Sequence, residues 1–426
     1  MRLSELHTGE KAYIVKVNGS GAFRKRLLEM GFVRGQEVKS ILNAPLKDPI
    51  KYNIMEYEVS LRRSEAVMIE ITMVKYDMPK YEQAITEKDS EKIFAQNTFT
   101  HPPKAFSQHK DSKTITVALV GNPNSGKTSI FNIASGSHEH VGNYSGVTVD
   151  SKEGKLKHKG YTFKLVDLPG TYSLSAYTPE ELFVRKYILE KKPDVIINVV
   201  SASSLERNMY LTTELMELKV PMVIALNMYD ELQGSGREFD HETLSVMIDT
   251  PIIPTIGKKG FGIPAMLDKI IEMHEVESKN EDDNVHISYG RVLEKAIHRL
   301  EQQFAKTDIS HLNMPLRYLC IKLLENDKDI HKVINTLDNH RAIFGRAERE
   351  RAYIENLLRE DPESAFTNAR YGFIAGGLRE TLSEKTNISE TTRILDTIVT
   401  NKYFGFPLFF VFLSLRTSCF KTNALY

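Results

Sequence analysis

The stretch Gly121-Asn122-Pro123-Asn124-Ser125-Gly126-Lys127-Thr128 matches the GxxxxGK[ST] pattern of a phosphate-binding loop. The apolar run 116–120 before it predicts a buried strand, and residues 129–133 after it can begin a helix. Between a strand and a helix, a glycine-rich backbone can turn its N–H groups toward a phosphate, and the helix dipole favours the negative charge. We therefore predict a nucleotide site that includes Gly121, Asn122, Asn124, Ser125, Gly126, Lys127, Thr128 and Ser129.

Two further segments supply groups that this chemistry needs. Asp167-Leu168-Pro169-Gly170 follows a predicted strand, and there the carboxylate can hold Mg²⁺ while the Gly170 N–H contacts a γ-phosphate. Thr148 lies between these two motifs, in a loop that can close over the metal and the γ-phosphate. Lys127 would reach the β- and γ-phosphates. The predicted catalytic residues are Lys127, Thr148 and Gly170, and the predicted Mg²⁺ ligands are Thr128, Thr148 and Asp167.

The segment Asn227-Met228-Tyr229-Asp230 predicts the choice of base. It ends the apolar run 222–226, and a carboxylate at Asp230 can accept two hydrogen bonds from guanine. Adenine offers neither of these donors in that geometry, so ATP would leave the carboxylate unpaired. We expect Asn227, Gly257 and Lys258 to line the same base pocket, the last two from the stretch 255–259.

Composition limits the other functions of the chain. The 426 residues carry 56 basic and 56 acidic side chains, which argues against nucleic-acid binding through bulk charge. The two cysteines, Cys320 and Cys419, indicate neither a disulfide framework nor a cysteine metal site. The opening residues do not resemble a signal peptide, so we expect a reducing cytoplasmic setting.

The hydrophobic pattern predicts several domains. Residues 1–75 contain five short strand-like runs and a helix over 23–30, which suggests a small β-barrel. On that helix we expect Arg24, Lys25 and Arg26 to form a solvated face. Residues 76–113 are polar and read as a linker. Residues 114–276 alternate strands and helices, as in a mostly parallel α/β sheet, and residues 286–395 show the periodicity of a helical bundle.

The last part of the chain holds the apolar run 403–415. A membrane-spanning helix needs about 20 apolar residues, and this run is shorter. Three interpretations remain open at this point, namely a buried helix, an interfacial anchor and the start of a membrane span.

The motifs GNPNSGKT, VGNYSGVTV, DLPGTYSL and NMYD closely resemble the cytosolic GTPase of bacterial ferrous iron transport protein B. The helical region resembles the helical domain of that family, and residues 1–75 resemble ferrous iron transport protein A, an SH3-like domain. The resemblance implies a P-loop GTPase that converts GTP to GDP and phosphate and regulates a ferrous iron transporter. It also implies a membrane pore as partner, the protein A-like domain acting in cis, and domains on the cytoplasmic side of the inner membrane. Assembly with further copies of this chain into a homo-oligomer is an open alternative.

The resemblance also bears on the monovalent cation and on the chain end. Asn124 matches the K⁺-ligating asparagine of similar GTPases, and Thr171 stands where Ras-like GTPases hold a water-positioning glutamine. Slow, K⁺-stimulated hydrolysis is therefore expected. The family continues into a long membrane pore, so we interpret 403–415 as a truncated first membrane helix and expect this chain to be cytoplasmic or weakly membrane-associated.

Two other functions remain alternatives. A soluble translation-type GTPase, acting in ribosome assembly or tRNA modification, would carry a basic RNA-binding module, and the sequence shows none. A nucleotide-dependent binding switch with negligible hydrolysis would have the same motifs.

Overall fold

The computed structural model describes residues 1–19, 21–43, 48–55, 57–75, 113–136, 139–143, 150–175, 177–275, 287–305 and 307–384. Thr148, nearly all of the expected linker 76–113, residues 385–395 and the apolar run 403–415 lie outside these ranges. Among the described helices, none combines the length and the apolar character needed to cross a membrane.

The N-terminal region forms the predicted β-rich domain. Its strands pair into one antiparallel sheet in the order β4-β3-β2-β1-β5, and the described edge strands β4 and β5 are not hydrogen-bonded to each other. Strand β3 shows why the sequence forms a sheet, because Ile50, Tyr52 and Ile54 alternate with more exposed residues and fill the core. The elements are β1 (Lys11–Val17), α1 (Ala22–Glu29), β2 (Glu37–Asn43), β3 (Ile50–Ile54), β4 (Tyr57–Leu61), α2 (Arg63–Ala66) and β5 (Ile69–Thr72).

The central region is a seven-stranded sheet in the order β13-β11-β10-β6-β9-β8-β7. The five strands from β13 to β9 run parallel, as predicted, and the central strands β10 and β11 are buried along their whole length. The strands are β6 (Thr114–Gly121), β7 (Glu139–Asn143), β8 (Asp150–His158), β9 (Tyr161–Asp167), β10 (Val195–Ser201), β11 (Met222–Asn227) and β13 (Ile252–Pro254).

Sequence reasoning missed β7 and β8, which add to the sheet as antiparallel strands. The reason is that β8 is charged along its length and lacks an apolar alternation. Its one fully buried position in the described part is Gly154, where a Cβ would meet the Cβ of Ser135 at 2.5 Å.

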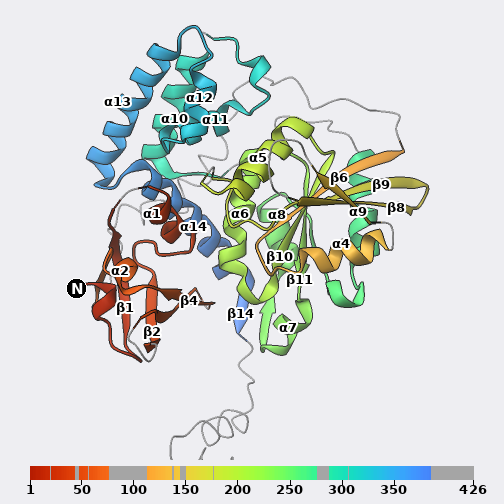
Figure 1. The fold of residues 1–426 in the computed structure, drawn as a ribbon, viewed down its shortest axis with the longest axis horizontal. Coiled ribbons are helices and arrows are strands. Elements are labelled where there is room, and N and C mark those ends of the chain that lie inside the picture. The colour runs from red at the N-terminus through yellow and green to blue at the C-terminus, as the bar shows by residue number, and fades with distance from the viewer. Residues whose placement is uncertain are drawn as a thin grey trace, which may run out of the picture.

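Helices cover both faces of this sheet (Figure 1). Helices α4 and α9 pack on one face, and α5 and α6 pack on the other. Helix α5 begins with a capping box in which Thr178 and Glu181 satisfy each other's backbone N–H groups, and Pro179 occupies the first turn. The elements are α4 (Lys127–Ser135), α5 (Pro179–Lys191), α6 (Leu205–Glu217), α7 (Tyr229–Gly234), β12 (Arg237–Phe239), α8 (His241–Met247) and α9 (Ile263–Glu275).

The third region is the predicted helical bundle. Cys320 is fully buried in its core, as expected of a packing thiol. Its last helix runs down from the bundle and passes between the N-terminal domain and the central domain (Figure 1), and β14 then pairs with β12 of the central domain. The elements are α10 (Gly290–Phe304), α11 (Leu316–Leu324), α12 (Lys328–Ile334), α13 (His340–Leu358), α14 (Pro362–Thr381) and β14 (Leu382–Glu384).

The expectation for the basic triplet on α1 was wrong. Arg26 is exposed, but Arg24 and Lys25 are 7% and 4% exposed and form ion pairs with Asp361 and Glu363 of the helical bundle. A run of charges on one helix gives no sign of an acidic partner more than 300 residues away. Only the packing of the domains reveals it.

Candidate functional site

The predicted phosphate-binding loop joins the end of β6 to the start of α4. Two of its glycines have no room for a side chain. A Cβ on Gly121 would lie 2.6 Å from the Val199 carbonyl oxygen. Gly126 has a φ of +85°, and a Cβ there would lie 2.1 Å from the Asn227 amide nitrogen. The loop is therefore held tightly by the strands β10 and β11 beside it.

Buried polar atoms of this loop lack partners within the described residues. Both polar atoms of the Asn122 side chain and the Ser125 hydroxyl are buried without a hydrogen bond. Such groups are costly unless something binds them. Together with the glycine-lined backbone at the start of α4, they fit a phosphate-bearing ligand.

Charged residues of two predicted motifs meet beside the loop. The Lys127 ammonium contacts the Asp167 carboxylate, and both side chains are nearly buried. The Thr128 hydroxyl lies 3.4 Å from the second oxygen of Asp167. The predicted metal ligands Thr128 and Asp167 are thus neighbours, and the acceptor oxygens present are those that Mg²⁺ prefers.

The segment after Asp167 turns back onto the phosphate loop. A Cβ on Gly170 would lie 3.2 Å from Pro123, and the Thr171 N–H donates to the Gly121 carbonyl. The Thr171 hydroxyl donates to the Ser173 carbonyl at 2.6 Å, and the side chain is buried. The Thr171 side chain therefore stabilises its own segment.

The base side of the site is organised by Asn227. Its amide nitrogen donates to the Ser125 carbonyl at 2.8 Å, and its amide oxygen accepts the Gly257 N–H at 2.8 Å. It thereby links the phosphate loop to the stretch that carries Gly257. Asp230 lies just beyond, with a partly exposed carboxylate that pairs with Lys259 at 3.1 Å.

The stretch 255–259 contacts both Asn227 and Asp230. Lys258 is exposed, and Lys259 rather than Lys258 contacts Asp230. Asn124 lies in the loop with a φ of +68°, and Ser129 lies in the first turn of α4. Thr148 lies outside the described residues.

Sequence reasoning missed the residues that hold the segment behind Gly170. The Leu174 N–H donates to Glu214 of α6 at 2.6 Å, and Glu214 pairs with Lys322 of the helical bundle at 2.7 Å. Lys322 is fully buried and also pairs with Glu325. The helical periodicity of residues 316–324 predicted that Lys322 lies in the bundle, but nothing in the sequence indicated that this side chain would face the central domain.

Three family models match successive parts of the chain. The model described as "FeoA domain" matches residues 1–73, "Ferrous iron transport protein B" matches residues 115–270, and "FeoB cytosolic helical domain" matches residues 289–383. These ranges follow the three packed regions of the structure.

Individual proteins agree with this assignment. The chain is 44% identical over 431 residues to an Fe(2+) transport protein A/Fe(2+) transporter FeoB fusion protein of Porphyromonas gingivalis, covering 97% of this chain and 51% of that protein. It is 35% identical over 326 residues to Fe(2+) transporter FeoB of Staphylococcus aureus, covering 72% of this chain and 44% of that protein. The chain therefore spans about half the length of the curated relatives it matches.

Solved structures show the same fold. A GDP-bound mutant of the S. thermophilus FeoB G-domain aligns with a TM-score of 0.57 at 36% identity, covering 63% of this chain and all of that chain. The cytosolic domain of the T. maritima FeoB iron transporter in apo form aligns with a TM-score of 0.53 at 26% identity, covering 63% of this chain and all of that chain. The chain belongs to the ferrous iron transport protein B family, and it carries an FeoA domain ahead of the GTPase and cytosolic helical domains of that family.

Proposed function

We propose that this chain binds GTP, hydrolyses it slowly to GDP and phosphate, and serves as the regulatory region of a bacterial ferrous iron transporter. The observation that carries the proposal is the set of buried, unpartnered polar atoms of Asn122 and Ser125 in a loop whose glycines admit no side chain. The GDP-bound relative of the same fold supports a guanine nucleotide as the ligand.

The residues present would act mainly by positioning and by neutralising charge. Lys127 already lies at the loop and would exchange its contact with Asp167 for the β- and γ-phosphates. The Gly170 N–H would donate to the γ-phosphate from its place against Pro123. When bound to Thr128, Thr148 and Asp167, Mg²⁺ would supply positive charge to the phosphates. No covalent intermediate with the protein is needed.

A monovalent cation would compensate for the missing glutamine. Thr171 is buried and bonded to its own segment, so this side chain cannot orient a water molecule. Asn124 is an exposed residue of the phosphate loop and would help to hold K⁺. We expect faster turnover in KCl than in NaCl, and we expect Asn124→Ala to lose this difference.

Asp230 would select guanine over adenine. Titration of the chain with GTP and with ATP should show a preference for GTP on the order of 10³-fold or more, because ATP leaves the carboxylate unpaired. Asp230→Ala should lose most of the GTP affinity. Glu231→Ala is a matched control, since Glu231 is the next acidic residue of α7 and is exposed. Equal affinities for GTP and ATP in the unaltered chain would refute the proposal.

The transporter context is part of the proposal. The relatives named above are Fe(2+) transporters and extend well beyond the part this chain matches. We propose that the partner is a membrane iron pore and that the three regions described here act on its cytoplasmic side.

A further inference from the structure

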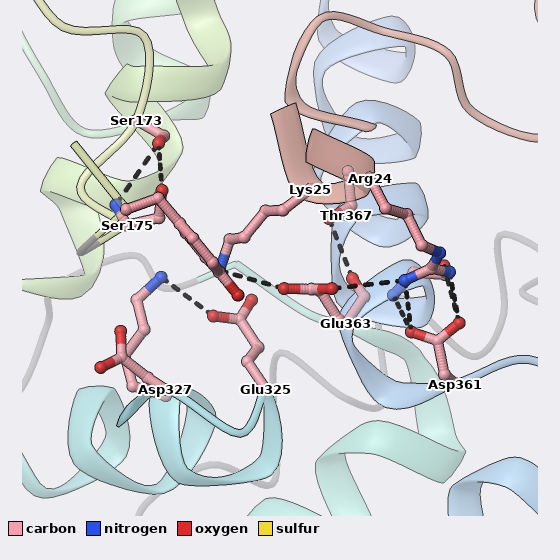
Figure 2. A network of polar contacts seen from close by, with 12 residues as sticks. Arg24, Lys25, Ser173, Ser175, Glu325, Asp327, Asp361, Glu363 and Thr367 are labelled. Atoms are coloured by element: carbon pink, nitrogen blue, oxygen red, sulfur yellow. Dashed lines mark hydrogen bonds and ion pairs between the residues drawn. The ribbon is translucent and has the colours of Figure 1, made fainter. Parts of the chain in front are cut away.

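The FeoA domain docks through α1 onto two other domains (Figure 2). Arg24 forms ion pairs with Asp361 and Glu363 at the start of α14, and Lys25 pairs with Glu363 at 3.3 Å. At the end of α1, the Tyr371 hydroxyl donates to the Glu29 carbonyl at 2.6 Å. These contacts fix the domain on the helical bundle.

The same domain also contacts the segment 171–178, which follows Gly170. The Lys25 ammonium lies 5.0 Å from the centre of the Tyr177 ring. The Arg207 guanidinium of α6 lies over the ring of Tyr57, from the FeoA domain, and over the ring of Tyr172, at 4.1 Å from each ring centre. The FeoA domain therefore rests directly on the segment that leads away from the phosphate loop.

Most buried carboxylates around this contact have a cationic partner. Glu214 pairs with Lys322, and Glu325 pairs with Lys322 and Arg370. Among the described residues Glu181 has no such partner, but it accepts hydrogen bonds from the Ser175 hydroxyl and from two backbone N–H groups. The buried polar contacts are therefore largely satisfied.

Glu29 differs from these groups. Its side chain is 6% exposed, and its Oε1 atom has no hydrogen-bond partner within the described residues. Lys25, one turn earlier on the same helix, contacts Glu363 and the Tyr177 ring. An ionised carboxylate buried in this way is costly, and such a group is neutralised instead.

We propose that Glu29 takes up a proton when the FeoA domain docks on the segment 171–178, so that docking is linked to pH. Burial raises the pKa of Glu29 to about 8, the acidic residues Glu181 and Glu214 push it in the same direction, and the positive charge of Lys25 opposes the rise. The unpaired oxygen and the pKa therefore agree that the docked carboxyl is neutral at pH 7.

The other groups that face Glu29 do not provide this proton linkage in the same range. Glu214, from α6, is held charged by its ion pair with Lys322. Tyr210 of α6 and Tyr371 of α14 are buried, and burial raises the pKa of each phenol, so both stay neutral. Burial also raises the pKa of Glu181, from α5, but this residue belongs to the central domain and hydrogen-bonds within it.

The sign of the effect follows from linkage. When the FeoA domain is undocked, Glu29 is expected to titrate near its ordinary pKa of 4.5, whereas in the docked state its pKa is about 8. Between these values the docked form binds one more proton, so docking is strongest at acidic pH and weakens as pH rises through 8. Ser175 lies five residues after Gly170 in the segment that the FeoA domain contacts. A change in docking would therefore alter the position of Gly170 at the proposed nucleotide site.

The test measures docking without any nucleotide, so its failure is separate from that of the proposed GTPase. Lys39→Cys and Arg349→Cys, exposed on the FeoA domain and on α13, carry a fluorophore pair in a Cys419→Ser background. Single-molecule energy transfer then gives the docked fraction. At the urea concentration that halves docking at pH 7.5, we expect roughly 90% docked chains at pH 6.5 and roughly 25% at pH 8.5.

Two glutamine variants test whether Glu29 causes the pH dependence of docking. Glu29→Gln should dock at both pH values with no change in the docked fraction between them. Glu360→Gln is the matched control, because Glu360 lies in the same interface and pairs with Arg34 at 2.9 Å. It should weaken docking but keep the change with pH. The proposal is overturned by a flat profile of the unaltered chain, by an unchanged profile in Glu29→Gln, or by a Glu29→Gln chain that no longer docks at pH 6.5.

Discussion

The phosphate loop and the ion pairs between the domains both bury polar groups, but only the ion pairs give those groups partners within the protein. We call the second set the ionic network; it consists of Arg24, Lys25, Glu214, Glu217, Lys322, Glu325, Asp361, Glu363 and Arg370. In the loop, the Asn122 side chain and the Ser125 hydroxyl are buried without partners. In the network, Lys322 and Arg370 each contact two carboxylates. Buried polar groups without partners indicate a site where a ligand supplies the hydrogen bonds. Buried polar groups with partners indicate a contact in which the protein supplies them.

This difference predicts that mutations in the loop change nucleotide binding, whereas mutations in the network change the stability of the packed domains. The loop should respond to changes that alter its shape while the protein stays folded. The network should respond to loss of one charge, because the partner is then buried without compensation. Glu29 belongs to the network by position but resembles the loop in having an unpaired oxygen, which is why we assign a proton to it.

The largest expected effect comes from breaking the network at its centre. Lys322→Met should lower the free energy of unfolding by roughly 3–5 kcal/mol, because Glu214 loses its cation while it remains buried. Urea denaturation followed by circular dichroism measures this loss.

Lys332→Met provides the control for that prediction. Lys332 is 79% exposed and lies 3.7 Å from Asp329, so its removal should change the unfolding free energy by less than about 0.5 kcal/mol. If the two methionine variants proved equally stable, the network would not hold the domains together as described.

A smaller effect should come from filling the phosphate loop. Gly126→Ala places a Cβ against the Asn227 amide and should lower GDP affinity by roughly 100-fold, which is about 2.7 kcal/mol. Isothermal titration calorimetry measures the affinity.

Gly136→Ala separates the steric contact from backbone strain. Gly136 also has a positive φ, of 62°, but a Cβ there meets nothing within 4 Å. This variant should lose some stability and bind GDP normally. Equal loss of affinity in both variants would show that strain alone, rather than the contact with Asn227, explains the result.

The smallest expected effect concerns the edge of the network. Arg24→Met should lower the unfolding free energy by about 1–2 kcal/mol, since it leaves Glu363 short of one cation while Asp361 remains partly exposed. Arg26→Met, on the exposed side of the same helix, should leave stability within about 0.5 kcal/mol of the original. Thermal unfolding of both variants gives the comparison, and a larger loss from Arg26→Met would contradict it.

Local sequence was enough to predict most elements of the central domain. The parallel strands around the phosphate loop are largely apolar, and β9 and β11 end in Asp167 and Asn227, residues with recognisable chemistry. Strand β8 escaped prediction because it lies toward the sheet edge and is rich in charged residues. The contact between Lys259 and Asp230 was not predicted either, because it depends on the turn that follows β13.

By itself, the sequence determined the three successive domains and the nucleotide motifs, because strand and helix periods and loop motifs depend on residues close together in the chain. Only the tertiary structure decided which charges are buried. In the sequence Arg24 and Lys25 resemble surface residues, but in the fold α14 brings Asp361 and Glu363 to them, and Glu29 of the same helix is buried as well. Burial and pairing depend on contacts between residues far apart in the chain, and these contacts set the energy of a charge.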